Sequence, residues 1–125
     1  ARSSSLVQKA NEAGVFAQTG FVMRYVATFQ RLRALIEDGR LGPLRGYSAS
    51  MRGNVLTKPP KPESWQGDFN RGGGSLNEYG PHIIDLCRFV FGEVVSVKRA
   101  EHGKVLSSNA DDWVNLDWSH ASASR

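Results

Sequence analysis

The stretch GGGSLNEYGPHIIDL, residues 72–86, joins three consecutive glycines to an apolar helical pattern. Glycines allow the backbone to approach another group closely or to take a positive φ. Beyond them, Glu78, His82 and Asp85 recur at i, i+4 and i+7, which a 3.6-residue period brings onto one line of a helix. An imidazole between two carboxylates on an otherwise apolar helix favours a general acid/base, because burial and neighbouring charge tune its pKa.

The same residues also have a purely structural interpretation. Ser75 and Glu78 fit a capping box, in which Glu78 reaches back to the amide of the N-cap residue Ser75. Pro81 has no N–H, so the regular helix can instead begin there, with Gly80 before it. A histidine on an apolar helix is more often a hydrogen-bonded core residue, and Asp85 would be its partner three residues later. The spacing alone leaves both interpretations open.

Composition indicates one soluble globular domain. At 125 residues, with 40% hydrophobic and 22% charged residues, the chain can bury a modest core. No apolar run approaches the roughly 20 residues of a membrane span, and residues 1–5 lack the apolar core of a signal peptide. The single cysteine, Cys87, cannot form an internal disulfide, so a reducing, cytoplasmic setting is expected.

The charge balance is basic, with 16 Lys and Arg against 12 Asp and Glu and a net charge of +4. These basic residues are scattered, and no recognition helix, zinc finger or RNA-binding pattern accompanies them. We therefore expect no nucleic-acid partner. A basic surface of this kind can attract an anionic substrate or a cofactor phosphate.

Hydrophobic periodicity predicts helices and strands on both sides of a long loop. The helices are expected at residues 3–13 and 27–38 and from the glycine run to Phe91. The strands are expected at 15–22, 44–52, 94–100 and 113–120. Residues 15–22 are short, mostly apolar and in part β-branched, and they predict a strand covered on both faces, whereas 44–52 alternate and predict one buried face. The loop 53–74 is long enough to suggest a function.

Three further residues are candidates for substrate binding. Arg24 follows the strand expected at 15–22, at the carboxyl end where open α/β sheets bind ligands, although a surface salt bridge would explain it equally well. Trp65 and Arg71 lie in the loop before the glycines. An aromatic ring beside polar groups suits a sugar or polyol, while the alternative is a tryptophan that pins the loop to the core.

The last expected strand has the clearest two-residue period. Val114, Leu116 and Trp118 share one face, and this apolar face needs a cover. An uncovered sheet face or edge tends to pair with another chain, so a homo-oligomer is expected.

Four segments together resemble one family. These are GFVMRY (20–25), IEDGRLGPL (36–44), the 72–86 stretch and FGE (91–93). In order and spacing they are similar to the glucose-fructose oxidoreductase, inositol dehydrogenase and rhizopine-catabolism (Gfo/Idh/MocA) family. The resemblance covers nearly the whole chain, and its last three segments correspond to the family's C-terminal domain.

The resemblance implies an NAD(P)-dependent oxidoreductase with a Rossmann domain followed by an α+β domain. In that second domain an open, mostly antiparallel sheet with helices on one face lines the substrate site and makes subunit contacts. Residues 1–25 would then be the end of the Rossmann domain, and 26–125 a truncated C-terminal domain. The chain has neither a Gly-x-Gly-x-x-Gly run after a strand nor the family's Glu-Lys-Pro motif with its catalytic lysine. Alone, it is expected to be inactive and to bind neither NAD nor NADP.

By the same resemblance, His82 corresponds to the histidine that exchanges the proton of the reacting hydroxyl. Glu78 stands where many members carry Asp, which leaves its part in the acid/base relay open. Arg24 corresponds to an arginine near the nicotinamide and the substrate. Asp85 is expected to be structural or to face the substrate.

Three functions follow from these observations. The preferred one is the substrate-binding and oligomerisation portion of an oxidoreductase acting on a sugar, a polyol or a related CH–OH compound. The second is a non-catalytic oligomerisation or binding module on the same scaffold. The third, in which Glu78, His82 and Asp85 hold a metal ion, is not favoured.

Overall fold

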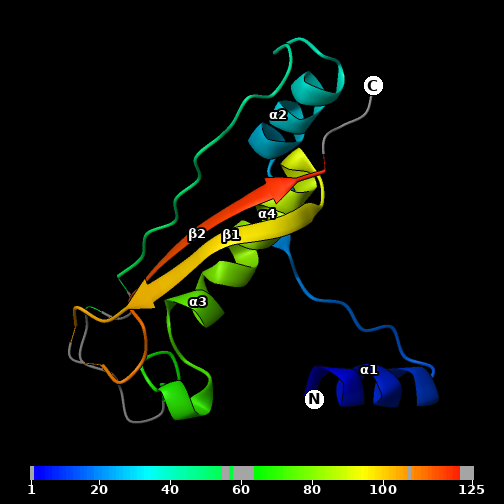
Figure 1. The fold of residues 1–125 in the computed structure, drawn as a ribbon. Coiled ribbons are helices and arrows are strands. Elements are labelled where there is room, and N and C mark those ends of the chain that lie inside the picture. Colours follow the sequence, from blue (N-terminus) through cyan, green and yellow to red (C-terminus); the bar gives the residue numbers. More distant parts are fainter. Residues whose placement is uncertain (1, 55–56, 58–63, 107, 122–125) are drawn as a thin grey trace.

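An antiparallel pair of strands backed by a long helix forms the centre of the structure (Figure 1). The computed structural model describes residues 2–54, 57, 64–106 and 108–121. Strand β1 (Val94–Gly103) pairs with β2 (Trp113–His120), and α4 (Gly80–Phe91) runs along one face of this sheet. Helix α2 (Ala27–Glu37) packs against α4. The domain is therefore α+β, with an open antiparallel sheet and helices on one face, as the sequence predicts.

The register of the sheet sets which side chains share a face. Trp118 lies opposite Val97, and Leu116 lies opposite Ala100. On β2, Val114, Leu116 and Trp118 are half-buried, while Asn115 and Asp117 are exposed. The predicted two-residue period is confirmed, and the apolar side of β2 faces inward.

The small core is centred on α4. Leu86, Cys87 and Val90 of this helix are 9%, 1% and 5% exposed. The helix begins with proline in its first turn and ends at Gly92, whose φ of 95° is one that favours glycine. The sequence signals for the start and the end of this helix were correct.

The strand predicted at residues 15–22 is wrong. Residues 15–21 are extended without pairing, and Val22–Tyr25 form a 3₁₀ helix, η1. Val15, Phe16 and Val22 are 59%, 89% and 65% exposed. An apolar strand needs neighbours that share its backbone hydrogen bonds, and no described strand lies beside this segment. Its apolar composition alone could not supply them.

The strand predicted at residues 44–52 is also wrong. The segment runs extended along the side of β2 but forms no sheet bridge with it (Figure 1). Tyr47 and Met51 are half-buried, but Ala49, which a two-residue period places on the same face, is exposed like its neighbours. The alternation in the sequence is therefore matched by burial at Tyr47 and Met51 alone, and it does not supply a hydrogen-bonded partner.

The first helix is found as predicted and lies away from the sheet. Helix α1 (Arg2–Glu12) is followed by a turn at Gly14, and its described side chains are all exposed or nearly so (Figure 1). None of the helices in the described part of the chain is both long and apolar enough to cross a membrane. The division into domains at residue 25 remains a prediction.

Candidate functional site

The glycine run makes the close approaches and left-handed turns that the sequence predicts. Gly72 and Gly74 have φ of 83° and 114°, a region that side chains rarely adopt. A Cβ on Gly73 would collide with the carbonyl oxygen of Trp65, and one on Gly74 would collide with the carboxylate of Asp111. Larger residues would therefore displace the helix that follows.

Asp111 caps that helix from a distant part of the chain. Helix α3 (Ser75–Glu78) has Gly74 as its N-cap residue, without a side-chain cap of its own. The Ser75 N–H donates to the Asp111 carbonyl oxygen at 2.8 Å, and the Leu76 N–H donates to Asp111 Oδ2 at 2.9 Å. The capping box of Ser75 and Glu78 is therefore not formed.

A one-residue break at Tyr79 separates α3 from α4. Pro81 lies in the first turn of α4 and has no N–H to continue the ladder, so the predicted start of regular helix near Pro81 is confirmed. Tyr79 keeps right-handed helical angles, and its carbonyl oxygen accepts the Ile83 N–H at 3.2 Å. The chain therefore continues to coil in the same sense through the break.

The side chains of Glu78 and His82 are half-buried and have no partner among the described residues. Neither side chain makes a hydrogen bond or an ion pair with another residue in the part of the chain that the structure describes. The hydrogen bond between His82 and Asp85 that the core interpretation expects is not formed, and Asp85 binds Arg24 instead. The acid/base role of His82 stays a prediction.

Asp85 is the buried acidic residue of α4, and it holds Arg24. The Arg24 Nε–H donates to Asp85 Oδ2 at 2.8 Å, and its Nη2–H donates to Oδ1 at 2.5 Å. The Asp85 side chain is 5% exposed and the Arg24 side chain 41%. The hydrogen bond to Asp85 raises the pKa of Arg24, although partial burial opposes this. The predicted salt bridge of Arg24 therefore exists, but its carboxylate is buried.

Two phenylalanines flank this arginine. The guanidinium carbon of Arg24 lies 5.6 Å from the ring centroid of Phe89 and 6.0 Å from that of Phe21. Cation–π attraction at such distances adds to the ion pair. The pair thus joins η1 to α4 and fixes the plane of the guanidinium.

The loop candidates lie elsewhere. Trp65 is 38% exposed. Arg71 ends a short 3₁₀ helix, η3 (Phe69–Arg71), and its Nη1–H donates to the Ser64 carbonyl oxygen at 3.1 Å. The structure brings Arg24 and Asp85 together on the side of α4 that carries His82. It shows no contact between these residues and either loop candidate.

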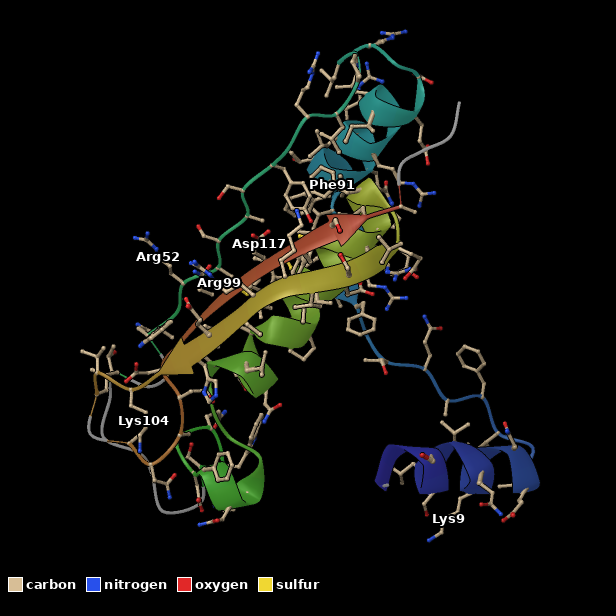
Figure 2. All side chains as sticks on the ribbon, viewed as in Figure 1. Lys9, Arg52, Phe91, Arg99, Lys104 and Asp117 are labelled. Carbon is tan, nitrogen blue, oxygen red and sulfur yellow. The ribbon has the colours of Figure 1, made fainter. Side chains whose placement is uncertain are left out.

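A groove on the opposite side of α4 was not predicted. It has a volume of about 1480 Å³ and lies between residues 42–53, β2 and the side of α4 that presents Ile83, Cys87 and Phe91. Arg52 projects from the extended segment at the rim of the groove (Figure 2). The figure also labels Lys9, Phe91, Arg99, Lys104 and Asp117. None of the predicted site residues lines this groove.

A polar and aromatic cluster closes one end of the groove. The Tyr47 ring stacks on Phe91 with centroids 3.7 Å apart, and its hydroxyl lies 2.5 Å from both Trp118 Nε1 and His120 Nε2. His120 Nδ1 lies 2.7 Å from the Gly92 carbonyl oxygen, so Nδ1 carries the proton of the neutral ring. Burial raises the pKa of Tyr47 to about 12. The polar groups of this cluster are hydrogen-bonded to one another. We call Tyr47, Trp118 and His120 the clasp, because their contacts attach the extended segment to β2.

Sequence reasoning missed Tyr47 and His120 because they are 73 residues apart. Nothing in the local spacing paired them.

The metal hypothesis finds no support in the geometry. Both oxygens of Asp85 are engaged by Arg24. Among the described residues, no group of three His, Cys, Asp or Glu side chains is placed to hold a metal ion.

The structure is that of an α+β domain in which helix α4 lies between an open antiparallel sheet and the ion pair of Arg24 with the buried Asp85. The family model for the GFO/IDH/MocA C-terminal domain matches residues 29–124. The chain therefore belongs to the Gfo/Idh/MocA family, through its C-terminal domain.

Curated relatives agree with this assignment. The chain is 27% identical over 111 residues to trans-1,2-dihydrobenzene-1,2-diol dehydrogenase of Mus musculus, covering 89% of this chain and 32% of the relative. It is 35% identical over 74 residues to glucose-fructose oxidoreductase domain-containing protein 1 of the same species, covering 59% and 18%. Glucose-6-phosphate 3-dehydrogenase of Bacillus subtilis (strain 168) is 29% identical over 91 residues, covering 71% and 26%. The chain thus spans a third or less of these relatives, and no solved structure matches it.

Proposed function

We propose that this chain supplies the acid/base and substrate-binding part of an NAD(P)-dependent oxidoreductase acting on a CH–OH group of a sugar, a polyol or a related compound. The observation that carries the proposal is His82. It is half-buried, has no partner among the described residues, and lies one helical turn from the Arg24–Asp85 pair. The names of two relatives, both dehydrogenases, favour the same reaction class.

The proposed role of His82 is to handle a proton. When an alcohol carbon is oxidised to a carbonyl, its hydroxyl proton must pass to a base, and the same proton must return in the reverse direction. A neutral imidazole can accept that proton near neutral pH. Glu78, four residues earlier, can orient the ring or stabilise its charged form. Arg24 would bind oxygen atoms of the substrate.

The glycine run of this chain, with the helix that follows it, does not fit a dinucleotide phosphate. A pyrophosphate site needs free N–H groups at a helix N-terminus. Here the first amides of α3, those of Ser75 and Leu76, are already capped by Asp111. We therefore expect the chain alone not to bind NADH or NADPH. Saturable fluorescence binding below about 10 µM, roughly −7 kcal/mol, would contradict this.

The activity test uses the complete protein that carries this chain. The reduction of NAD⁺ or NADP⁺ is followed by absorbance at 340 nm with polyols, sugars, sugar phosphates and dihydrodiols as substrates. The expected turnover number is ~10⁻¹ to 10² s⁻¹. The proposal expects turnover with at least one of these classes, in the reducing, cytoplasmic conditions that the single Cys87 suggests. Absence of turnover with every class and both cofactors would favour the non-catalytic module.

We also propose that the protein forms homo-oligomers through its sheet. Val95 and Val97 of β1 are each 61% exposed, and Leu116 lies half-buried along the open groove. Exposed apolar sheet surface of this kind tends to pair. Light scattering should show a dimer or larger that Leu116→Lys weakens. The matched control, Asp117→Lys, changes the exposed neighbour on the other face and should leave assembly intact. A monomer at high concentration would refute the proposal.

A further inference from the structure

The pair between Arg24 and Asp85 uses one edge of the guanidinium. The Nε–H and one Nη2–H are donated to the carboxylate, at 2.8 and 2.5 Å. A guanidinium carries five N–H donors. The donors of Nη1 and the outer N–H of Nη2 have no acceptor among the described residues. One N–H of Nη1 and the outer N–H of Nη2 form the end edge, whose parallel N–H bonds match two oxygens of a carboxylate or a phosphate.

Burial of the carboxylate fixes the direction of this free edge. The Asp85 side chain is 5% exposed, whereas that of Arg24 is 41% exposed. A buried acceptor cannot swing into solvent, and water competes poorly for it. With Phe89 and Phe21 on the flanks of the guanidinium, the plane of the group is set, and the exposed part of Arg24 can offer its end edge.

A second arginine of the same chain lacks this arrangement. Arg88 is also bound side-on, to Glu93, with N–O distances of 2.8 and 2.9 Å. However, both side chains of that pair are exposed, at 45% and 68%. Exposed pairs are weak and exchange with water. Among the ion pairs of the described residues, Asp85 is the one buried carboxylate.

The location of the pair connects it to His82. Asp85 follows His82 by three residues on α4, so the two side chains lie on the same side of the helix. Arg24 is attached at that point from η1. A ligand bound to the free edge of Arg24 would therefore lie on the side of α4 that carries His82.

We propose that Asp85 is a positioning residue, which holds Arg24 so that its free edge binds the carboxylate or phosphate of an anionic substrate beside His82. This names a substrate class for the proposed function and depends on it for the reaction. The binding step itself requires no turnover and can be tested on the 125-residue chain.

The test follows the side-chain N–H signals of Arg24 and Arg88 by NMR. The chain is titrated with sodium acetate and, separately, with inorganic phosphate, at an ionic strength held constant with NaCl. The expected result is a saturable shift at Arg24 with one probe or both, and a linear, weak shift at Arg88. Acetate tests whether the edge binds a carboxylate, and inorganic phosphate tests whether it binds a phosphate group.

Two variants separate positioning from charge. Asp85→Asn keeps the shape of the side chain but cannot accept both N–H groups, so binding should weaken about tenfold or more. Arg24→Lys keeps a positive charge opposite the buried Asp85 but removes the fork, and it should weaken binding similarly. If Asp85→Asn fails to fold, Arg24→Lys still gives the decisive comparison. Binding unchanged in a folded variant, or an Arg24 response no different from that of Arg88, would overturn the proposal.

In the complete protein, Asp85→Asn should raise KM for an anionic substrate at least tenfold more than KM for its neutral analogue. A residue with a merely structural role would affect both substrates equally, and that result would overturn the proposal. If the wild-type protein had no turnover at all, the proposed function would fail, whereas the binding result on the 125-residue chain would stand by itself.

Discussion

The two sides of α4 differ in whether their polar groups have partners. On one side, His82 has no partner among the described residues and lies near the ion pair of Arg24 with the buried Asp85. On the other, Cys87 and Phe91 border a groove in which Tyr47 is clasped by its neighbours. The 3.6-residue period separates the two sides by roughly half a turn of the helix.

A hollow is not by itself a candidate for chemistry, because its polar groups can already be engaged. The groove is wide, but the hydroxyl and ring nitrogens at its end are hydrogen-bonded to one another. The histidine side combines His82, which has no partner among the described residues, with an arginine held by a buried carboxylate. A reacting substrate needs donors and acceptors that are free, and this is why we propose the chemistry for the histidine side.

The core residue between the two sides should give the largest loss of stability. Leu86 is 9% exposed and contributes to both sides, so Leu86→Ala should cost about 2–4 kcal/mol through lost burial and a cavity. Urea unfolding measures the change. Leu76→Ala, at a leucine that is 37% exposed, is the control and should cost less than half as much. Equal losses would mean that Leu86 is not the shared core.

The glycine run that leads into the histidine side should be the next most sensitive. Gly74→Ala combines a φ of 114° with a collision against Asp111, and about 1–3 kcal/mol of strain is expected. Gly72→Ala has a similar φ of 83° but meets nothing within 4 Å, so it isolates the backbone term. Thermal unfolding of both variants tests this order, and an equal effect would show that the Asp111 contact adds nothing.

The clasp on the groove side should contribute least. Tyr47→Phe removes the hydroxyl between Trp118 and His120, and a loss of about 0.5–1.5 kcal/mol is expected at pH 7. Urea unfolding measures it. Tyr25→Phe, at a tyrosine that is 73% exposed, should have almost no effect.

The same substitution predicts a pH dependence. Burial raises the pKa of Tyr47 to about 12, while an unfolded tyrosine titrates near 10. The stability contributed by this hydroxyl is therefore complete below about pH 10 and is lost as the pH rises towards 12. Unfolding curves across this range should show a loss in the wild type that is smaller in Tyr47→Phe. Parallel curves would contradict the assignment.

The sequence pattern predicted the helices, strands and turns that depend only on residues close together in the sequence. Helix α2, helix α4 and the pairing strands β1 and β2 follow from periodicity with glycine or proline at their ends. The left-handed turns at Gly72 and Gly74 follow from the absence of a Cβ. His82 and Asp85 were placed correctly on one side of a helix because the period of that helix is fixed.

Long-range partners could not be read in this way. The cap from Asp111 comes from 35 residues beyond Leu76, and the partner of Asp85 comes from 61 residues before it. Residues 15–22 and 44–52 have strand-like sequences, but a strand also requires an adjacent backbone, which composition does not specify. For the same reason the clasp of Tyr47 on β2 carried no sequence signal.

The most direct test of this account is the kinetics of His82→Ala in the complete protein, with Cys87→Ala as the matched variant on the groove side. His82→Ala should lower kcat by about 10² to 10⁴-fold, the usual effect of losing a general acid/base, with little change in melting temperature. Cys87→Ala, at a side chain that is 1% exposed, should lower the melting temperature and leave kcat nearly unchanged. If His82→Ala instead left kcat intact and chiefly lowered the melting temperature, the assignment of chemistry to this side of α4 would be wrong.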